Sequence, residues 1–140
     1  MSTKIFVNLP VKDLDRTVAF FTALGFRFNP QFTNEKATCM IISEEAFVML
    51  LVEPFFQGFT PKPIADATKS TEVLLCLSAD SRAEVEQMVA KAVAAGGKTP
   101  TPPQDHGFMY QHGFEDLDGH LWEVAYMDMA AFPATPAGQS

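Results

Sequence analysis

The sequence predicts an α+β fold made of two β-α-β-β-β modules. Short apolar segments bounded by turn residues recur along the chain and are typical of strands. Two other segments carry apolar residues at helical spacing, and glycine follows each of them. The same order of elements occurs twice within 140 residues, which indicates an internal duplication.

The first module is predicted over residues 3–53. Asp13 is a favourable N-cap for its helix, which carries Phe21 and Leu24 on one face and ends at Gly25. Apolar, extended segments before and after this helix predict the strands of the module. The strands are predicted at 4–9, 26–32, 38–42 and 46–52.

The second module is predicted over 71–127 and repeats this order. Ser81 aligns with Asp13 as a helix cap, and the helix ends at Gly96 and Gly97. A proline-rich turn then leads into a hairpin. The strands of this module are predicted at 72–78, 107–115 and 120–127.

A long connection over 54–70 joins the two modules. It contains three prolines and three phenylalanines and has no clear period. A packed crossover loop is the favoured interpretation, and a lid over a pocket is the alternative. Residues 1–129 are expected to form a single domain, and 130–140 a flexible tail.

The predicted hairpin turns at an Asp-Leu-Asp-Gly segment that ends at Gly119. A type I turn closed by a left-handed glycine bulge pairs Gly113 with Glu123. A four-residue loop would instead place His112 opposite Glu123. The bulged turn is favoured because glycine adopts the left-handed conformation readily. His120, next to the turn, is expected to lie in solvent.

Charge and composition exclude several classes of protein. Seventeen acidic residues against ten scattered basic ones give a net charge of −7, which argues against nucleic acid or an anionic membrane as partner. No apolar run approaches the ~20 residues of a membrane-spanning helix. A strand begins almost at once, which leaves no signal peptide, so the chain is expected in the cytoplasm. There Cys39 and Cys76 are expected as buried thiols rather than a disulfide.

Three segments together carry a family resemblance. They are residues 11–26, the Ala-Ala-Gly-Gly end of the second helix, and residues 114–124, where the Asp-Leu-Asp-Gly turn precedes a glutamate on the next strand. In this order they resemble the vicinal oxygen chelate superfamily, which includes glyoxalase I, bleomycin-resistance proteins, fosfomycin-resistance enzymes and extradiol dioxygenases. The most similar group is the bacterial predicted lactoylglutathione lyases. The resemblance implies that the modules form a cup-like curved sheet with helices outside, and that the chain is a homodimer.

The metal enzymes of this superfamily hold their ion with four ligands, a His or Gln on the first strand of each module and a Glu on the last. By the resemblance, these positions fall on Phe6, Met49, Leu74 and Glu123. Only Glu123 is a ligand of the family type, so three of the four usual ligands are absent and no cofactor is assigned. A pair of His106 and Glu123 is the remaining hypothesis for a divalent metal.

The favoured function is the binding of a small molecule in an apolar pocket. The side chains expected to line it are Phe6, Asn8, Met49, Leu74, Cys76 and Met109. Such a pocket serves either chemistry on a substrate that the sequence does not name, or sequestration of a drug or metabolite. The alternative is a metal-dependent lyase or isomerase of lactoylglutathione lyase type. In an enzyme, Glu123 would move a proton, with His106 or Tyr110 as the acid.

Overall fold

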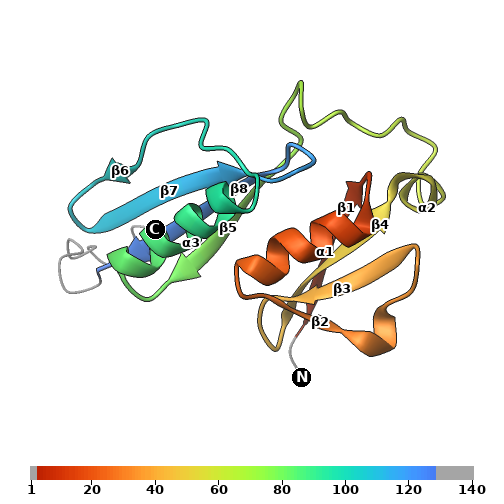
Figure 1. The fold of residues 1–140 in the computed structure, drawn as a ribbon, viewed down its shortest axis with the longest axis horizontal. Coiled ribbons are helices and arrows are strands. Elements are labelled where there is room, and N and C mark those ends of the chain that lie inside the picture. The colour runs from red at the N-terminus through yellow and green to blue at the C-terminus, as the bar shows by residue number, and fades with distance from the viewer. Residues whose placement is uncertain (1–2, 129–140) are drawn as a thin grey trace, which may run out of the picture. The chain divides into compact units, whose positions relative to one another are not determined.

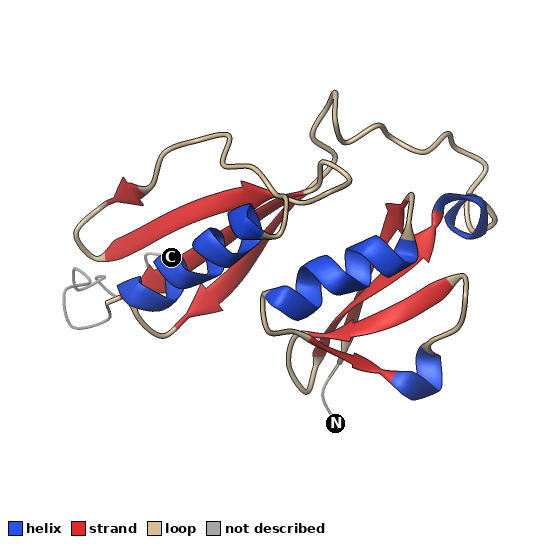
Figure 2. Ribbon diagram, in the orientation of Figure 1, coloured by secondary structure: helices blue, strands red, loops and turns tan. Residues whose placement is uncertain are grey.

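The computed structural model describes residues 3–128, which divide into two compact units. Unit 1 comprises the residues up to Glu72 together with Leu117–Gly119. Unit 2 comprises Val73–Asp116 and the residues from His120 onward. Each unit contains one four-stranded sheet and one long helix (Figures 1 and 2). The predicted α+β class and the two β-α-β-β-β modules are therefore confirmed.

The elements of unit 1 follow the predicted order. They are β1 (Ile5–Val11), α1 (Leu14–Ala23), β2 (Arg27–Asn29), β3 (Ala37–Ile41) and β4 (Ala46–Val52). The strand order in the sheet is β1-β4-β3-β2. β1 runs parallel to β4, whereas β3 is antiparallel to both of its neighbours. Helix α1 contacts β4 and lies along one face of the sheet (Figure 1).

Unit 2 repeats this topology. Its elements are β5 (Leu74–Ala79), α3 (Arg82–Ala94), β6 (Gln104–Asp105), β7 (Met109–Glu115) and β8 (Leu121–Met127). The strand order is β5-β8-β7-β6, with β5 parallel to β8 and the other pairs antiparallel. Helix α3 packs on β5, β7 and β8.

Both helices begin and end where the sequence predicts. The side chains of Asp13 and Ser81 each accept a hydrogen bond from the backbone N–H three residues later, which satisfies an otherwise unpaired donor. After the helices, Gly25 and Gly96 have φ angles of 104° and 109°. Only glycine adopts these angles without strain, so the chain turns sharply there.

The strand register confirms the internal duplication. Phe6 on β1 pairs with Phe47 on β4, and Leu74 on β5 pairs with Leu121 on β8. These are the positions that align between the two halves of the sequence. Equivalent residues therefore occupy equivalent places in the two sheets.

Four local features differ from the sequence prediction, the first being the two-residue strand β6, which lies outside the predicted strands. β1 continues through Pro10, which is tolerated because β1 is an edge strand. Residues Pro30–Phe32 form a 3₁₀ turn instead of extended chain. The connection begins with a short helix, α2 (Glu53–Gln57), whose first turn accommodates a proline. The tail predicted over 130–140 lies outside the described residues.

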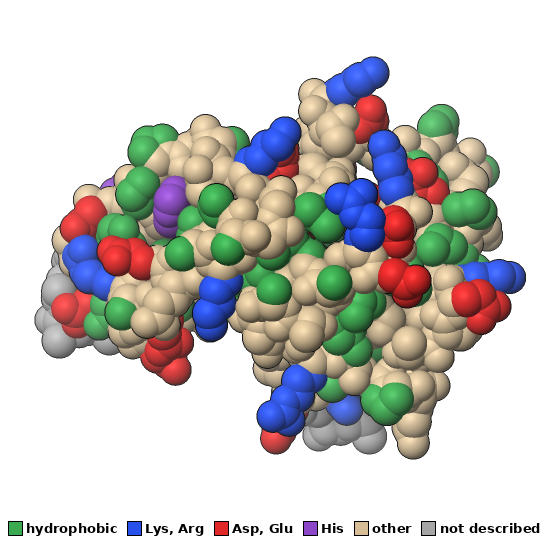
Figure 3. Space-filling model, viewed as in Figure 1, with side chains coloured by type: hydrophobic (Ala, Val, Ile, Leu, Met, Phe, Trp, Pro, Cys, Tyr) green, Lys and Arg blue, Asp and Glu red, His purple; other side chains and the backbone are tan. Residues whose placement is uncertain are grey.

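The apolar core of each unit lies between its helix and its sheet. The most deeply buried large side chains there are Phe20, Phe21, Met40 and Leu50 in unit 1, and Val85, Phe114, Trp122 and Val124 in unit 2. Acidic and basic side chains are interspersed on the face shown in Figure 3. None of the helices in the described part is long and apolar enough to cross a membrane.

Candidate functional site

Each sheet has one face under its helix and one open face. In unit 1, Leu9 and Leu50 point toward α1 and are almost completely buried. Alternation along the strands places Phe6, Asn8 and Met49 on the opposite, open face. These three predicted pocket residues therefore lie on one surface of unit 1.

An aromatic pair and an amide dominate this open face. The rings of Phe6 and Phe47 stack with centroids 4.8 Å apart, and Phe6 is 50% exposed. Asn8 donates from Nδ2 to the carbonyl oxygen of Phe6 at 3.2 Å. Because this bond uses the amide nitrogen, the Oδ1 atom of Asn8 is left to accept a hydrogen bond from a ligand.

The connection after β4 closes a pocket over this face. Helix α2 contacts β1 and β4, and a pocket of about 370 Å³ is lined by Asn8, Phe56, Phe59 and Thr60. Its size lies within the usual range for small-molecule sites. Three of these lining residues belong to the connection and were not predicted as site residues. The three phenylalanines of that segment were the sequence feature that indicated packing against the fold, since a solvent-exposed linker rarely contains several aromatic residues.

In unit 2, the open face is built around a carboxylate. Glu123 on β8 pairs with Cys76 on β5 and with Gly113 on β7. A Cβ atom at Gly113 would lie 2.9 Å from Oε2 of Glu123, so the absence of a side chain makes room for the carboxylate. No hydrogen bond joins this carboxylate to any residue in 3–128. It is therefore open to a ligand.

Cys76 lies beside this carboxylate and is exposed, so the prediction of a buried thiol was wrong for this residue. Partial desolvation, reinforced by the negative charge of Glu123, raises the pKa of the Cys76 thiol. Cys39 is buried as predicted, and both thiols are free. Leu74 and Met109 share the open face with Glu123, and Leu74 is 60% exposed.

The hairpin register is the predicted bulged one. Gly113 pairs with Glu123, and Gly119 has a φ of 88° at the turn. His112 accordingly lies on the face away from Glu123 and bonds to the carbonyl of Thr101 at 3.0 Å.

The prediction of a solvent-exposed His120 was wrong, because only 1% of its surface is exposed. Its backbone N–H donates to Oδ1 of Asp116 at 3.0 Å, and the indole Nε1–H of Trp122 donates to Oδ2 at 2.9 Å. Asp116 is itself buried. Both ends of the Asp-Leu-Asp-Gly turn, Asp116 and Gly119, are therefore buried, while Leu117 and Asp118 are half-buried.

The structure does not bring His106 and Tyr110 to Glu123. Tyr110 lies on the helix face, where its hydroxyl donates to Glu86 of α3 at 3.2 Å. His106 is exposed beside Met109 at the far end of β7. Met109 is four residues from the partner of Glu123, a separation of about 13 Å along a strand. The structure therefore does not form the expected acid–base pairs of Glu123 with His106 or Tyr110, nor the expected metal pair of Glu123 with His106.

The superfamily resemblance implies a metal bound by four side chains, at the positions of Phe6, Met49, Leu74 and Glu123. Unit 1 offers a phenyl ring at Phe6 and a thioether at Met49, and unit 2 offers an alkyl group at Leu74 and the carboxylate of Glu123. Hard divalent ions require oxygen or imidazole ligands, which three of these side chains lack. Within residues 3–128, no three His, Cys, Asp or Glu side chains are grouped closely enough to hold an ion. The residues present do not fit that metal centre.

Comparison with known proteins gives a family match over the N-terminal part of the chain and several structures with the same fold. The model of the bleomycin resistance protein-like N-terminal family matches residues 3–43. A hypothetical protein from S. aureus is 30% identical, with 90% of this chain and 95% of that chain covered and a TM-score of 0.76. A glyoxalase-related enzyme from Fulvimarina pelagi is 20% identical, covering 99% of this chain and 100% of that chain with a TM-score of 0.77.

A fosfomycin resistance protein from Mesorhizobium loti shares the fold at 13% identity, with 93% of this chain and 96% of that chain covered and a TM-score of 0.68. No curated protein sequence matches the chain. The match over residues 3–43 and the shared fold make the chain similar to proteins of the glyoxalase/bleomycin resistance/dioxygenase family.

Proposed function

We propose that the chain binds a small aromatic molecule that carries a hydrogen-bond donor, and that the pocket of unit 1 is the site. The single observation that carries this proposal is the lining of that pocket by Asn8, Phe56, Phe59 and Thr60. Two rings offer stacking surface, and the amide oxygen of Asn8 offers an acceptor. The net charge of −7 favours a cationic ligand through long-range attraction.

The relatives support a role in capturing or modifying small molecules. Their names refer to bleomycin resistance, glyoxalase relatives and fosfomycin resistance. In this chain, the apolar residues at three of the four usual ligand positions favour binding over metal chemistry. The proposed activity is sequestration of an aromatic amine, whether drug or metabolite.

The test is calorimetric titration with naphthylmethylamine. Phe56→Ala should weaken binding about tenfold, because a ring face is lost. Asn8→Leu should weaken it by roughly fivefold, the usual worth of one neutral hydrogen bond. Phe32→Ala is the matched control, since that ring is 60% exposed and does not line the pocket. Equal affinity in all three variants would contradict the proposal.

A second candidate function is a lyase or isomerase that uses Glu123. The observation that favours it is a carboxylate without a hydrogen-bond partner in the described residues, held over Gly113 on an open face. Such a group can remove a proton next to a carbonyl. The hemithioacetal of methylglyoxal and glutathione is the assay substrate, with Glu123→Gln as the inactive variant and Cys76→Ser as the control. Turnover that survives Glu123→Gln would exclude this role.

The family resemblance also leads us to propose a cytoplasmic homodimer. Free thiols at Cys39 and Cys76 suit a reducing compartment. The exposed Phe6 and Leu74 side chains provide apolar surface of the kind that a second subunit covers. Sedimentation velocity at micromolar concentration should give the mass of two chains, and a monomer would contradict the proposal.

A further inference from the structure

Two adjacent phenylalanines of α2 line different pockets. Phe56 faces the pocket that contains Asn8, whereas Phe55 lines a second pocket of about 580 Å³. Successive residues on a helix are rotated by about 100°, so their rings point in different directions. Strand alternation agrees, since Val52 of the second pocket belongs to the α1 side of the sheet and Asn8 to the open side.

The walls of the second pocket are mostly apolar. Its lining consists of Lys36, Val52, Pro54, Phe55, Gly58 and Phe59. The rings of Phe55 and Phe59 meet edge to face, with centroids 5.3 Å apart and an interplanar angle of 80°. A ring or alkyl group can therefore rest against two aromatic surfaces. The volume is typical of small-molecule sites.

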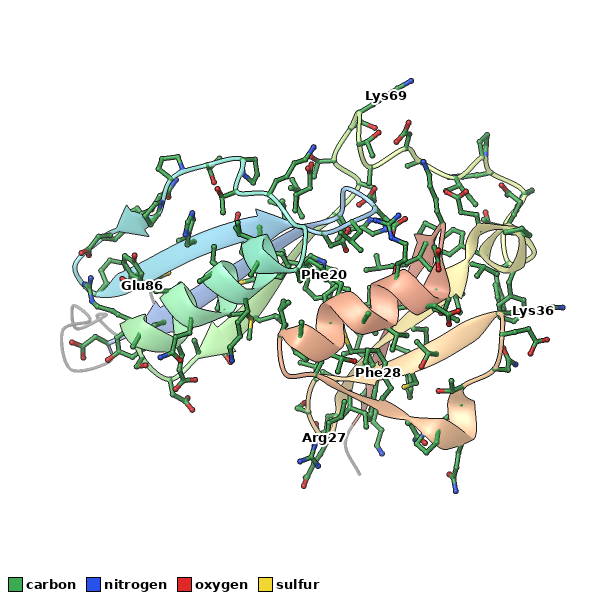
Figure 4. All side chains as sticks on the ribbon, viewed as in Figure 1. Phe20, Arg27, Phe28, Lys36, Lys69 and Glu86 are labelled. Atoms are coloured by element: carbon green, nitrogen blue, oxygen red, sulfur yellow. The ribbon has the colours of Figure 1, made fainter. Side chains whose placement is uncertain are left out.

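Lys36 supplies the single charge of this lining. Its backbone is fixed on both sides, because its N–H donates to Oδ1 of Asn34 at 2.8 Å and its carbonyl accepts from Val52 at 2.9 Å. No ion pair to Lys36 is present among residues 3–128. Figure 4 shows the side chain extending outward from the start of β3. A fixed backbone with a free ammonium group suits an anionic ligand.

We propose that this second pocket binds a small aromatic or alkyl carboxylate. The apolar body lies against Phe55 and Phe59, and the carboxylate pairs with the ammonium group of Lys36. This site goes beyond the proposed function, because the amine site is lined by Asn8 and Phe56 instead. Phe59 lines both pockets, so it is left unchanged in the test.

Naphthoate is the probe, and its binding is followed by calorimetry and by its own fluorescence. Lys36→Gln should weaken binding about fivefold, the usual strength of one partly solvated ion pair. Lys36→Arg should retain the affinity. Phe55→Ala should weaken binding about tenfold, through the loss of one aromatic wall. Lys62→Gln is the matched control, since this lysine lies in the connection that carries Phe55 but lines neither pocket.

The outcomes separate this site from the first one. Phe56→Ala should leave naphthoate affinity unchanged, while Phe55→Ala should leave naphthylmethylamine affinity unchanged. Uncharged naphthylmethanol should bind wild-type protein as weakly as naphthoate binds Lys36→Gln. Equal affinity of the alcohol and the acid for wild type, or no effect of Lys36→Gln, would overturn the proposal. Far-UV circular dichroism and melting temperature confirm that each variant is folded, and Phe55→Leu replaces Phe55→Ala where that variant is not.

Discussion

Replacing Asp116 tests whether the Asp-Leu-Asp-Gly turn is structural. In Asp116→Ala, the indole N–H of Trp122 and the backbone N–H of His120 both lose their carboxylate acceptor. Trp122 and His120 are each only 1% exposed, so water does not replace that acceptor without rearrangement. A buried donor left unpaired costs about 1–3 kcal/mol. We expect Asp116→Ala to lower the free energy of unfolding by about 3 kcal/mol.

Urea denaturation, followed by the fluorescence of the single tryptophan, measures this loss. With a slope of about 2 kcal/mol per molar, the midpoint should fall by about 1.5 M. Asp116→Asn keeps one acceptor oxygen, so its loss should be about half as large. Glu44→Ala, at an exposed turn position, is the control and should change stability by less than ~0.5 kcal/mol.

A double-mutant cycle with Trp122→Phe isolates the bond between the two side chains, with circular dichroism replacing tryptophan fluorescence. We expect a coupling energy of about 1–3 kcal/mol, the range for a hydrogen bond to a charged group. An Asp116→Ala variant within ~0.5 kcal/mol of wild type, or a coupling near zero, would refute the reasoning. Either result would mean that Asp116 does not stabilise the Asp-Leu-Asp-Gly turn through these hydrogen bonds.

Three further predictions follow from single contacts. Gly119→Ala should lower the free energy of unfolding by about 2–3 kcal/mol, because φ is 88° and a Cβ atom would lie 2.8 Å from the backbone of the connection. An unchanged midpoint of urea denaturation would contradict this. The hydrogen bonds from Arg82 lower the pKa of Asp105 to about 2. This ion pair therefore stabilises the fold above about pH 4, and its contribution is lost as the pH falls to about 2. The melting temperature of Asp105→Asn should be below that of wild type at neutral pH and equal to it near pH 2. Glu123→Gln should lower the pKa of Cys76 and speed its alkylation by iodoacetamide at mildly alkaline pH, and an unchanged rate would argue against their proximity.

Local sequence signals were enough to predict the modules. Asp13, Ser81, Gly25 and Gly96 act through hydrogen bonds and backbone angles within a few residues, so their effects are visible in the sequence. The bulged register at Gly119 was predicted for the same reason. The family resemblance named Phe6, Asn8 and Met49 as pocket residues, and the strand pairing places all three on one face.

The sequence by itself thus determined the class and the repeat, because these depend on short-range geometry. The tertiary structure decided which polar groups meet. It buried His120 beside Asp116, turned Tyr110 toward α3, and placed His106 beside Met109, four residues along β7 from the partner of Glu123. Strand pairing and helix packing join residues far apart in the chain, and no local pattern records their distances.

The pockets around α2 depended on tertiary structure most of all. The connection has no regular period, so its phenylalanines gave no sign of which surface each would face. Their positions follow from the docking of α2 against β1 and β4, which sends Phe55 and Phe56 into different pockets. Side chains on an irregular segment are placed by the surface that receives them, because only that packing selects one conformation among many.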